Sequence, residues 1–225
     1  MLPVTPARRL AAQVSLVAAP VLVLVSTLTQ PDFGDGSADR LTAVASDGAA
    51  LSAVTFLVAQ LPMLVVFLAI GLLLVPTAPR LSAWGTASGV LGCFGHSVFG
   101  GLSAMQLVMA RDTDARETYV ALLDDLESSP LMAFAAVGLI GTVVGFLLLG
   151  IGLFRTRTGP VWVGPAIWAF LVVEFVGSNL SDSAVYLSNL IIGLALVALV
   201  PVVGGRGARH ADDEDVRSPH VEQVG

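Results

Sequence analysis

Long apolar segments, separated by short polar ones, make up most of this chain. Six of them run over residues 10–30, 52–75, 81–110, 131–154, 161–180 and 184–203. An α-helix needs about 20 consecutive apolar residues to cross the hydrocarbon core of a bilayer, and each segment has about that length. The pattern predicts an all-α fold, a six-transmembrane helical bundle built of three hairpins.

The two ends of the chain differ from this apolar middle. Arg8 and Arg9 precede the first segment, as they would in a signal peptide, but its apolar run is longer than the roughly 7–15 residues of a signal-peptide core. We therefore expect residues 1–9 to be a short N-terminus and residues 10–203 to form the membrane domain. Residues 204–225 are Gly-rich and then acidic (ADDEDV), which predicts a disordered tail.

Two of the polar segments carry a helical pattern of their own. The apolar positions at helical spacing are Tyr119, Leu122, Leu123 and Leu126 in the second long loop, with a weaker version at Leu41, Val44 and Ala45 in the first. Such spacing predicts short amphipathic helices that lie on the outer membrane surface or cap the bundle. A solvated lid with no partner is the simpler interpretation of both.

Arginines gather in the connections on one side of the predicted bundle. They are Arg8, Arg9, Arg80, Arg155, Arg157, Arg206, Arg209 and Arg217, at the N-terminus, in two short turns and in the tail. The opposite connections hold three arginines among many acidic residues. Because cytoplasmic connections carry the excess of Lys and Arg, we expect a multi-pass protein of the cell membrane with both termini cytoplasmic.

Composition agrees with a membrane protein. The 225 residues are 55% hydrophobic and 12% charged, with a mean hydropathy of +0.85, whereas soluble domains carry about 25% charged residues. The single cysteine, Cys93, excludes an intrachain disulfide and a cysteine-rich metal site. The expected partner is membrane lipid, with a small-molecule ligand and a second copy of the chain as further options and no nucleic acid.

Two stretches of the chain are similar to each other. FLAIGLLLV (67–75) and FLLLGIGLF (146–154) share Phe, Leu, Gly and Leu at matching positions, and each precedes a turn with Arg and Pro and then a tryptophan, Trp84 or Trp162. An acidic loop with a helical pattern comes before each. These matches predict a tandem repeat of lid plus hairpin, followed by a third hairpin without a lid.

Four polar residues interrupt the spans at one depth. His96 and Glu174 each lie twelve residues after the tryptophan near the start of their span, so the repeat makes them equivalent. Counted from the arginine-rich side, these two residues, Gln60 and Asn189 all lie about 21–24 Å into a core about 30 Å thick. We therefore expect one polar layer in the outer half of the bundle.

Ionisable residues inside a membrane are costly and usually face the bundle interior, paired with one another. Glu174 beside His96 would suit a proton relay, a polar ligand site or acid–base catalysis, because a histidine can change charge near neutral pH. Glu174 and His96 are the candidate catalytic residues, and Gln60 and Asn189 the candidate substrate-binding residues. The simpler alternative is a protonated, hydrogen-bonded Glu174, a neutral His96 in the core, and amides that join helices.

No metal or cofactor is expected. The sequence contains no Walker loop, dinucleotide fingerprint, zinc-protease motif or nucleophile elbow. One intramembrane histidine cannot supply both ligands of a bis-histidine haem. His210 and His220 lie beside acidic residues in the tail, which is a weak pattern for metal.

Arginine-flanked hairpins, acidic lids and the segment SPLMAF…FLLLGIGLFR (129–155), followed by a Pro and a Trp, are features of residues 9–203. In these features the chain resembles a group of multi-pass membrane proteins of high-GC bacteria and haloarchaea whose activity is uncharacterised. The resemblance implies a six-span fold and no particular activity. Glu174 and His96 match no motif of that group.

The leading hypothesis is a membrane protein that binds or transports a small solute through the polar layer. The alternatives are a membrane-embedded enzyme, such as a lipid or isoprenoid cyclase or isomerase, and a non-catalytic helper subunit. In the enzyme, Glu174 would be the acid and His96 the base or its orienter. A transporter needs a polar path to both faces, an enzyme a closed apolar pocket ending at Glu174, and a helper a large exposed apolar face.

Overall fold

The computed structural model describes residues 5–34, 36–181 and 183–205, with their side chains except that of Glu127. Every regular element in these ranges is a helix, which confirms the all-α prediction for this part of the chain. The helices are α1 (Pro6–Thr29), α2 (Ser37–Val44), α3 (Asp47–Leu74), α4 (Pro79–Met109), α5 (Arg116–Glu127), α6 (Met132–Thr156), α7 (Val163–Phe175), the 3₁₀ helix η1 (Gly177–Asn179) and α8 (Ser183–Val197). The predicted disordered tail lies outside the described residues from residue 206 on.

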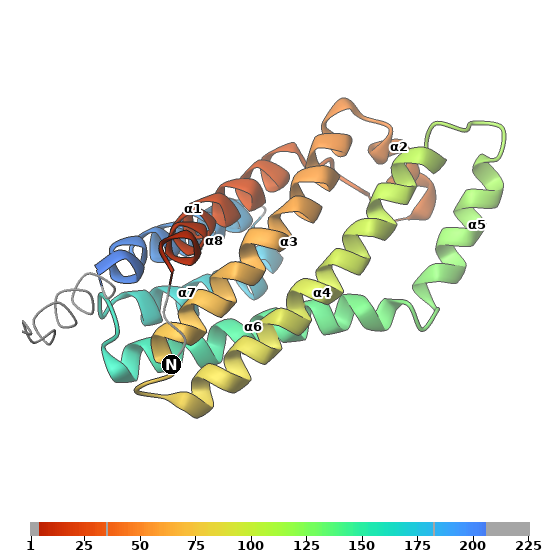
Figure 1. Ribbon diagram of the computed structural model, residues 1–225. Coiled ribbons are helices and arrows are strands. Elements are labelled where there is room, and N and C mark those ends of the chain that lie inside the picture. The colour runs from red at the N-terminus through yellow and green to blue at the C-terminus, as the bar shows by residue number, and fades with distance from the viewer. Residues whose placement is uncertain (1–4, 35, 182, 206–225) are drawn as a thin grey trace, which may run out of the picture.

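The long helices and the α7–α8 hairpin pack side by side (Figure 1), and their contacts form a closed ring. α1 contacts α3 and α8, α4 lies between α3 and α6, and α7 lies between α6 and α8. α3 also contacts α6 across the ring. Contact between α1 and α8, which are distant in the sequence, closes the bundle.

Five helices are long and apolar enough to cross a membrane: α1, α3, α4, α6 and a helix over Ser183–Gly205 that contains α8. This supports an integral membrane protein. The remaining predicted span, residues 161–180, forms a shorter helical stretch, Val163–Asn179. Six complete spans and the internal repeat therefore stay predictions.

The end of α7 explains why this span is shorter than its apolar composition suggests. The Ser178 hydroxyl donates to the carbonyl oxygen of Glu174, and the Asn179 amide donates to the carbonyl oxygen of Phe175 over 2.7 Å. Ser and Asn side chains offer the backbone an alternative to continued α-helix. The α-helix accordingly ends at Phe175 and the chain continues as a 3₁₀ turn.

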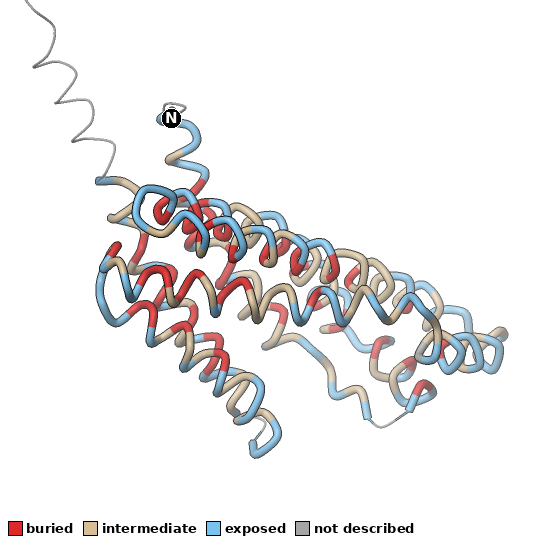
Figure 2. Tube along the Cα trace, turned by 90° about the horizontal axis from the view of Figure 1, so that it is seen from below, coloured by how far each residue is buried: buried red, intermediate tan, exposed pale blue. Residues whose placement is uncertain are grey.

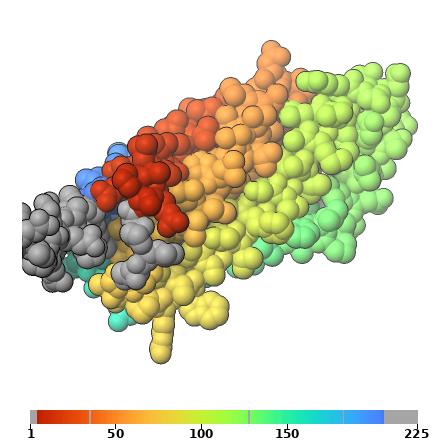
Figure 3. Space-filling view, viewed as in Figure 1, coloured from red at the N-terminus to blue at the C-terminus, as the bar shows by residue number. Residues whose placement is uncertain are grey.

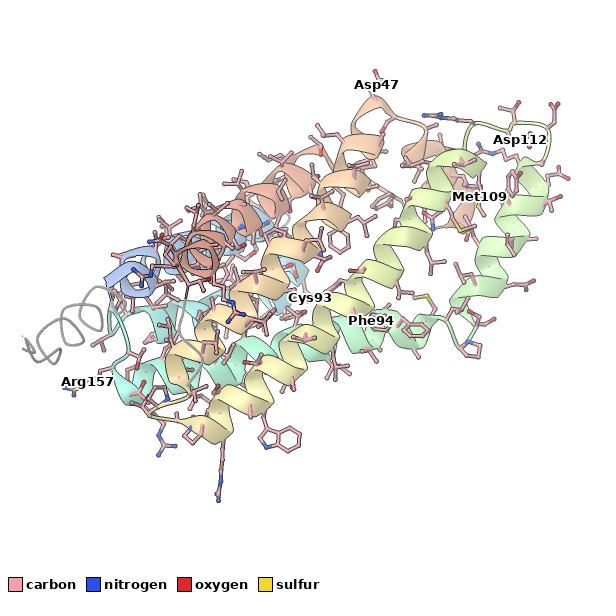
Figure 4. All side chains as sticks on the ribbon, viewed as in Figure 1. Asp47, Cys93, Phe94, Met109, Asp112 and Arg157 are labelled. Carbon is pink, nitrogen blue, oxygen red and sulfur yellow. The ribbon has the colours of Figure 1, made fainter. Side chains whose placement is uncertain are left out.

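The connections between helices separate by charge. The two short helices predicted in the long loops, α2 and α5, lie at one end of the bundle, which we call the lid end. Asp47 and Asp112 lie at this end, and Arg157 lies at the opposite, arginine end (Figure 4). Both ends of the described chain lie at the arginine end (Figure 1). That this end faces the cytoplasm stays a prediction.

The tightest packing lies in the half of the bundle nearer the arginine end. Phe67 of α3 and Phe146 of α6 are buried there with ring centroids 4.6 Å apart, and Ile167 of α7 and Leu196 of α8 are fully buried around them. Figure 2 shows most of the buried positions along the inner sides of the helices in this half. The α7–α8 hairpin stops short of the lid end (Figure 1), so α2 and α5 complete the bundle there.

α4 and α6 approach each other to backbone contact. A methyl group added at Gly95 would lie 2.3 Å from the backbone nitrogen of Gly138, and one at Gly92 would lie 2.5 Å from that of Thr142. Small residues at such a crossing allow two helices to pack this closely. By contrast, a methyl group at Gly101, farther along α4, would meet nothing within 4 Å.

Candidate functional site

The four polar residues expected in one layer fall into two groups. In the first, the side-chain carboxyl of Glu174, near the end of α7, is hydrogen-bonded to the Ser188 hydroxyl of α8. The neighbouring Asn189 donates its amide Nδ2–H to Oγ1 of Thr27 in α1 over 3.0 Å. This group joins α1, α7 and α8.

The Ser188 hydroxyl lies near two hydrogen-bond acceptors but has a single proton to donate. It is fully buried and lies 2.8 Å from the carbonyl oxygen of Val185 as well as beside Glu174. A hydroxyl donates a single hydrogen bond. It can therefore donate either to the Val185 carbonyl or to the Glu174 carboxyl, but not to both at once.

His96 and Gln60 form the second group, around Phe56. The imidazole of His96 meets the Phe56 ring edge to face, with centroids 5.7 Å apart. Gln60 is buried and donates its Nε2–H to the backbone carbonyl of Phe56 over 3.0 Å. This group therefore lies between α3 and α4.

The expected pairing of Glu174 with His96 is not formed. In the part of the chain that is described, no ion pair or hydrogen bond joins them, because Glu174 contacts α8 whereas His96 contacts α3. α6 lies between their helices, α4 and α7, in the ring. Equal depth did not imply contact, and a shared catalytic role for the two residues stays a prediction.

Two adjoining cavities lie at the lid end. The first has a volume of about 150 Å³ and lies among α1, α2, α3 and α4, with Phe56 in its wall. The second has a volume of about 290 Å³ and lies between α4 and α5. Arg40, Phe99 and Gln106 line both cavities. Figure 3 shows the side chains of α5 meeting those of α4 across the gap between the two ribbons, so this face of the bundle is covered.

Gln106 is the unusual residue of these cavities. Its side chain is only 8% exposed, yet its amide makes no hydrogen bond to any residue in the described ranges. The amide nitrogen and oxygen still reach accessible space, because among the described residues Nε1 of Trp168 is the enclosed side-chain atom that lacks a hydrogen-bond partner. The Gln106 amide is therefore an unused pair of donors and an unused acceptor in the wall that the two cavities share.

The hydroxyl groups around the first cavity already have acceptors. Ser26 and Ser52 each donate to the other's backbone carbonyl, over 3.0 and 2.9 Å, and Ser103 donates to the carbonyl of Phe99 over 3.2 Å. These serines can still accept hydrogen bonds through their oxygens. Their protons, unlike those of the Gln106 amide, are engaged.

Arg40 supplies the positive charge of the site. It projects from α2, is half-buried, and holds its guanidinium carbon 5.7 Å from the centroid of the Phe33 ring, within the range of a cation–π contact. None of the described acidic residues lines either cavity. Arg40 thus places a guanidinium group at the boundary between the two cavities.

Polar contacts hold α2 and α5 together above the cavities. Arg116 of α5 donates from Nη2 to the carbonyl of Ala38 over 2.8 Å and to Oγ1 of Thr42 over 2.6 Å. Ser37 of α2 donates to Oδ1 of Asp124 in α5 over 2.6 Å. The two short helices thus have partners in each other, and together they form a lid rather than two separate solvated loops.

Gln106 is not among the site residues predicted from the sequence. The residue lies ten positions beyond His96 in the same predicted span, which places it about 15 Å farther along the helix and outside the common depth of the four selected residues. The sequence feature that could have identified Gln106 is its position as an amide inside an apolar span, with no charged residue within three positions on either side. Its lack of a partner is visible only in the folded chain.

Comparisons with known proteins assign no family. No protein-family model, no curated protein and no solved structure matches this chain. The functional conclusion therefore depends on the cavities and on the side chains that line them.

Proposed function

We propose that this chain is an integral membrane protein that binds a small amphiphilic molecule in the two cavities at its lid end. The observation that carries the proposal is Gln106, a mostly buried residue in the wall common to both cavities, whose amide has no hydrogen-bond partner among the described residues. Polar residues inside membrane domains are costly and mark sites of function.

The lining of the cavities supports a ligand that is part polar and part apolar. Ligand sites are mostly apolar, with a few polar groups that fix the orientation of the bound molecule. The second cavity is lined mainly by apolar side chains, among them Leu102, Leu123 and Met132. The first adds hydroxyl groups, and His96 and Gln60 lie next to its wall through Phe56.

The cavities support binding more directly than transport or catalysis. Both lie at the lid end, so they provide no polar path toward the arginine end. Glu174 and Ser188 line neither of them, so the two cavities give no support to an enzyme with Glu174 as its acid. Exposed apolar residues of α4, such as Trp84 and Val108, are the surface that lipid covers in any membrane bundle, and they give the helper hypothesis no specific support.

Photo-crosslinking tests the proposal. The full chain, in nanodiscs of phosphatidylcholine, is exposed to a mixture of diazirine-bearing single-chain probes with carboxylate, hydroxyl and ammonium head groups. We expect crosslinks in peptides 99–109 and 116–127, read by mass spectrometry. Ala53→Phe places a ring in the first cavity and should reduce this labelling at least severalfold.

Ala87→Phe is the matched control, because Ala87 is exposed on α4 far from the lid end. It should leave the labelling pattern unchanged. Crosslinks spread evenly over the lipid-facing helices, or equal labelling of the Ala53→Phe and wild-type chains, would show that the cavities do not bind these molecules.

A further inference from the structure

We propose that the ligand is a neutral single-chain amphiphile whose hydroxyl head group accepts a hydrogen bond from the Gln106 amide and donates one to Oγ of Ser103. Its hydrocarbon chain lies in the cavity between α4 and α5. This inference rests on the proposed function and names the chemical class of the molecule that the same site takes.

Ser103 and Gln106 are neighbours on one face of α4. They lie three positions apart, and side chains at this spacing on a helix have Cβ atoms about 5–6 Å from each other. Both residues line the cavity among α1 to α4. One small polar group between them can therefore contact both side chains.

The two side chains offer complementary hydrogen-bonding groups. The amide of Gln106 has two N–H donors without a partner among the described residues, in the wall that the two cavities share. Ser103 has its proton engaged with the carbonyl oxygen of Phe99 over 3.2 Å, so its oxygen is left as an acceptor. The polar group of the ligand must then accept at Gln106 and donate at Ser103.

A hydroxyl is the smallest head group that does both. A carboxylate or an ether has no proton for the Ser103 oxygen, and an ammonium group has no acceptor for the Gln106 amide. Ser26 and Ser52, whose protons are also engaged with carbonyls, add further acceptor oxygens to the same cavity. Arg40 lies in the wall as well, with its guanidinium near the Phe33 ring, and a hydroxyl needs no charge from it.

The cavity between α4 and α5 takes the hydrocarbon. It is bounded by Leu102, Leu123, Leu126 and Met132, and its volume is about 290 Å³, at the lower end of the roughly 300–1,000 Å³ typical of ligand pockets. A two-chain phospholipid needs far more room. A single chain can place part of its length in this space.

The test compares four photo-probes of equal chain length that differ only in the head group: hydroxyl, methyl ether, carboxylate and ammonium. With the wild-type chain in nanodiscs, we expect the hydroxyl probe to label peptides 99–109 and 116–127 most efficiently. Its labelling should exceed that of the methyl ether about fivefold, the effect of one neutral hydrogen bond. Unlabelled hexadecanol should compete with the hydroxyl probe.

Two variants separate the two hydrogen bonds. Ser103→Ala removes the acceptor, so the ratio of hydroxyl to ether labelling should fall to about one while ether labelling itself persists, which shows that the variant is folded. Gln106→Leu removes the donor and should lower labelling by both probes about fivefold, since both accept there. Ser103→Ala, which introduces a better helix former, decides the assignment if Gln106→Leu does not fold.

Ser97→Ala is the matched control. Ser97 lies on the same helix and donates to the carbonyl of Cys93 as Ser103 does to that of Phe99, but it lines neither cavity. This variant should keep the fivefold ratio of hydroxyl to ether labelling.

Three results overturn the head-group assignment and leave the binding function standing. They are equal labelling of the wild-type chain by hydroxyl and ether, stronger labelling by carboxylate or ammonium than by hydroxyl, and a fivefold ratio that persists in Ser103→Ala. Absence of cavity labelling by all four probes removes both proposals.

Discussion

At the scale of single residues, Glu174 shows how a carboxyl group is accommodated among apolar helices. Its partner is a serine on the next helix, and that serine also lies beside a backbone carbonyl. The group that stabilises the carboxyl is thus a hydroxyl rather than the imidazole expected from the sequence. The partner of the carboxyl is thus a hydrogen-bond donor that carries no charge.

Substitutions at this pair should separate hydrogen bonding from charge. Glu174→Gln keeps an oxygen that accepts from the Ser188 hydroxyl, so we expect its stability to stay within about 0.5 kcal/mol of the wild type. Ser188→Ala leaves the carboxyl without its partner and should cost about 1–3 kcal/mol. Thermal unfolding in detergent, followed by circular dichroism, measures both changes.

The same Ser188→Ala change in a Glu174→Leu background is the control. It should cost much less there, because no carboxyl remains to be left unpaired. A full-sized loss in that background would mean that Ser188 acts through packing alone.

Tyr119 offers a pH-dependent prediction outside the membrane. The negative charge of Asp112, and then the 3.2 Å hydrogen bond from the phenol to its Oδ2, raise the pKa of Tyr119 above its usual value of 10.0. Because the pKa is raised in the folded state, the contact contributes stability below the usual tyrosine pKa and loses it as the pH rises through the folded value. Asp112→Asn should lower the pKa of Tyr119, measured by ultraviolet titration of tyrosinate in a Tyr186→Phe background that leaves one tyrosine.

Some of these residues were predictable from the sequence, whereas their contact partners were not. Gln60 and His96 were placed at one depth, and both do contact Phe56. Depth along a helix follows from counting residues, but the direction in which a side chain points depends on how the helices are rotated in the bundle. The role of Ser188 as the partner of Glu174 was not predictable, because a serine in an apolar helix commonly bonds to a carbonyl of its own helix.

At the scale of helices, the contact between α4 and α6 is set by glycine positions. Gly95 and Gly101 are two glycines of the same helix with opposite surroundings: one meets the backbone of α6, and the other has open space. Substituting each of the two glycines therefore compares the effect of helix packing with the effect of helix propensity on stability, within one helix.

Alanine substitutions at these glycines should have opposite signs. Gly95→Ala forces a methyl group against the Gly138 nitrogen and should destabilise the protein by about 1–3 kcal/mol. Gly101→Ala meets no obstacle and should stabilise α4 by up to about 1 kcal/mol, the usual gain over glycine inside a helix. Thermal unfolding of the two variants measures both effects. If the unfolding temperatures of both variants shifted in the same direction, the result would contradict the α4–α6 contact.

The lid helices depend on Arg116 for their contact with each other. Arg116→Met removes two hydrogen bonds to α2, so amide hydrogen exchange over residues 37–44 should become about fivefold faster, equivalent to about 1 kcal/mol. Arg111→Met, in the loop before α5, is the control. Unchanged exchange in α2 after Arg116→Met would show that the other contacts of the lid are sufficient.

Helix lengths were only partly predictable from composition. The apolar run 161–180 has the length of a span. Its 3₁₀ end is accompanied by side-chain hydrogen bonds of Ser178 and Asn179, and a hydropathy pattern contains no information on such bonds. The short helices α2 and α5 were predictable, because their apolar positions repeat at helical spacing. Their mutual contact was not, since it joins segments about 80 residues apart.

At the scale of the whole molecule, acidic connections lie at the lid end and arginine-rich turns at the other. Because membrane insertion places arginine-rich connections in the cytoplasm, we expect the lid end to face outward. In intact cells and a Cys93→Ala background, an impermeant maleimide should label Asp125→Cys but not Thr77→Cys, two exposed positions at opposite ends. Both should react after lysis, and the reverse pattern in intact cells would invert the orientation.

The short α7 also has a consequence for the lipid around the protein. Its α-helical part, Val163–Phe175, is about 20 Å long, beside a hydrocarbon core about 30 Å thick. Lipids next to a helix that is too short adjust by locally thinning the bilayer. If α7 crosses the membrane, we therefore expect an uneven hydrophobic belt, thinner beside α7 than beside α4, which would bring Glu174, one residue from the end of α7, close to headgroups and water.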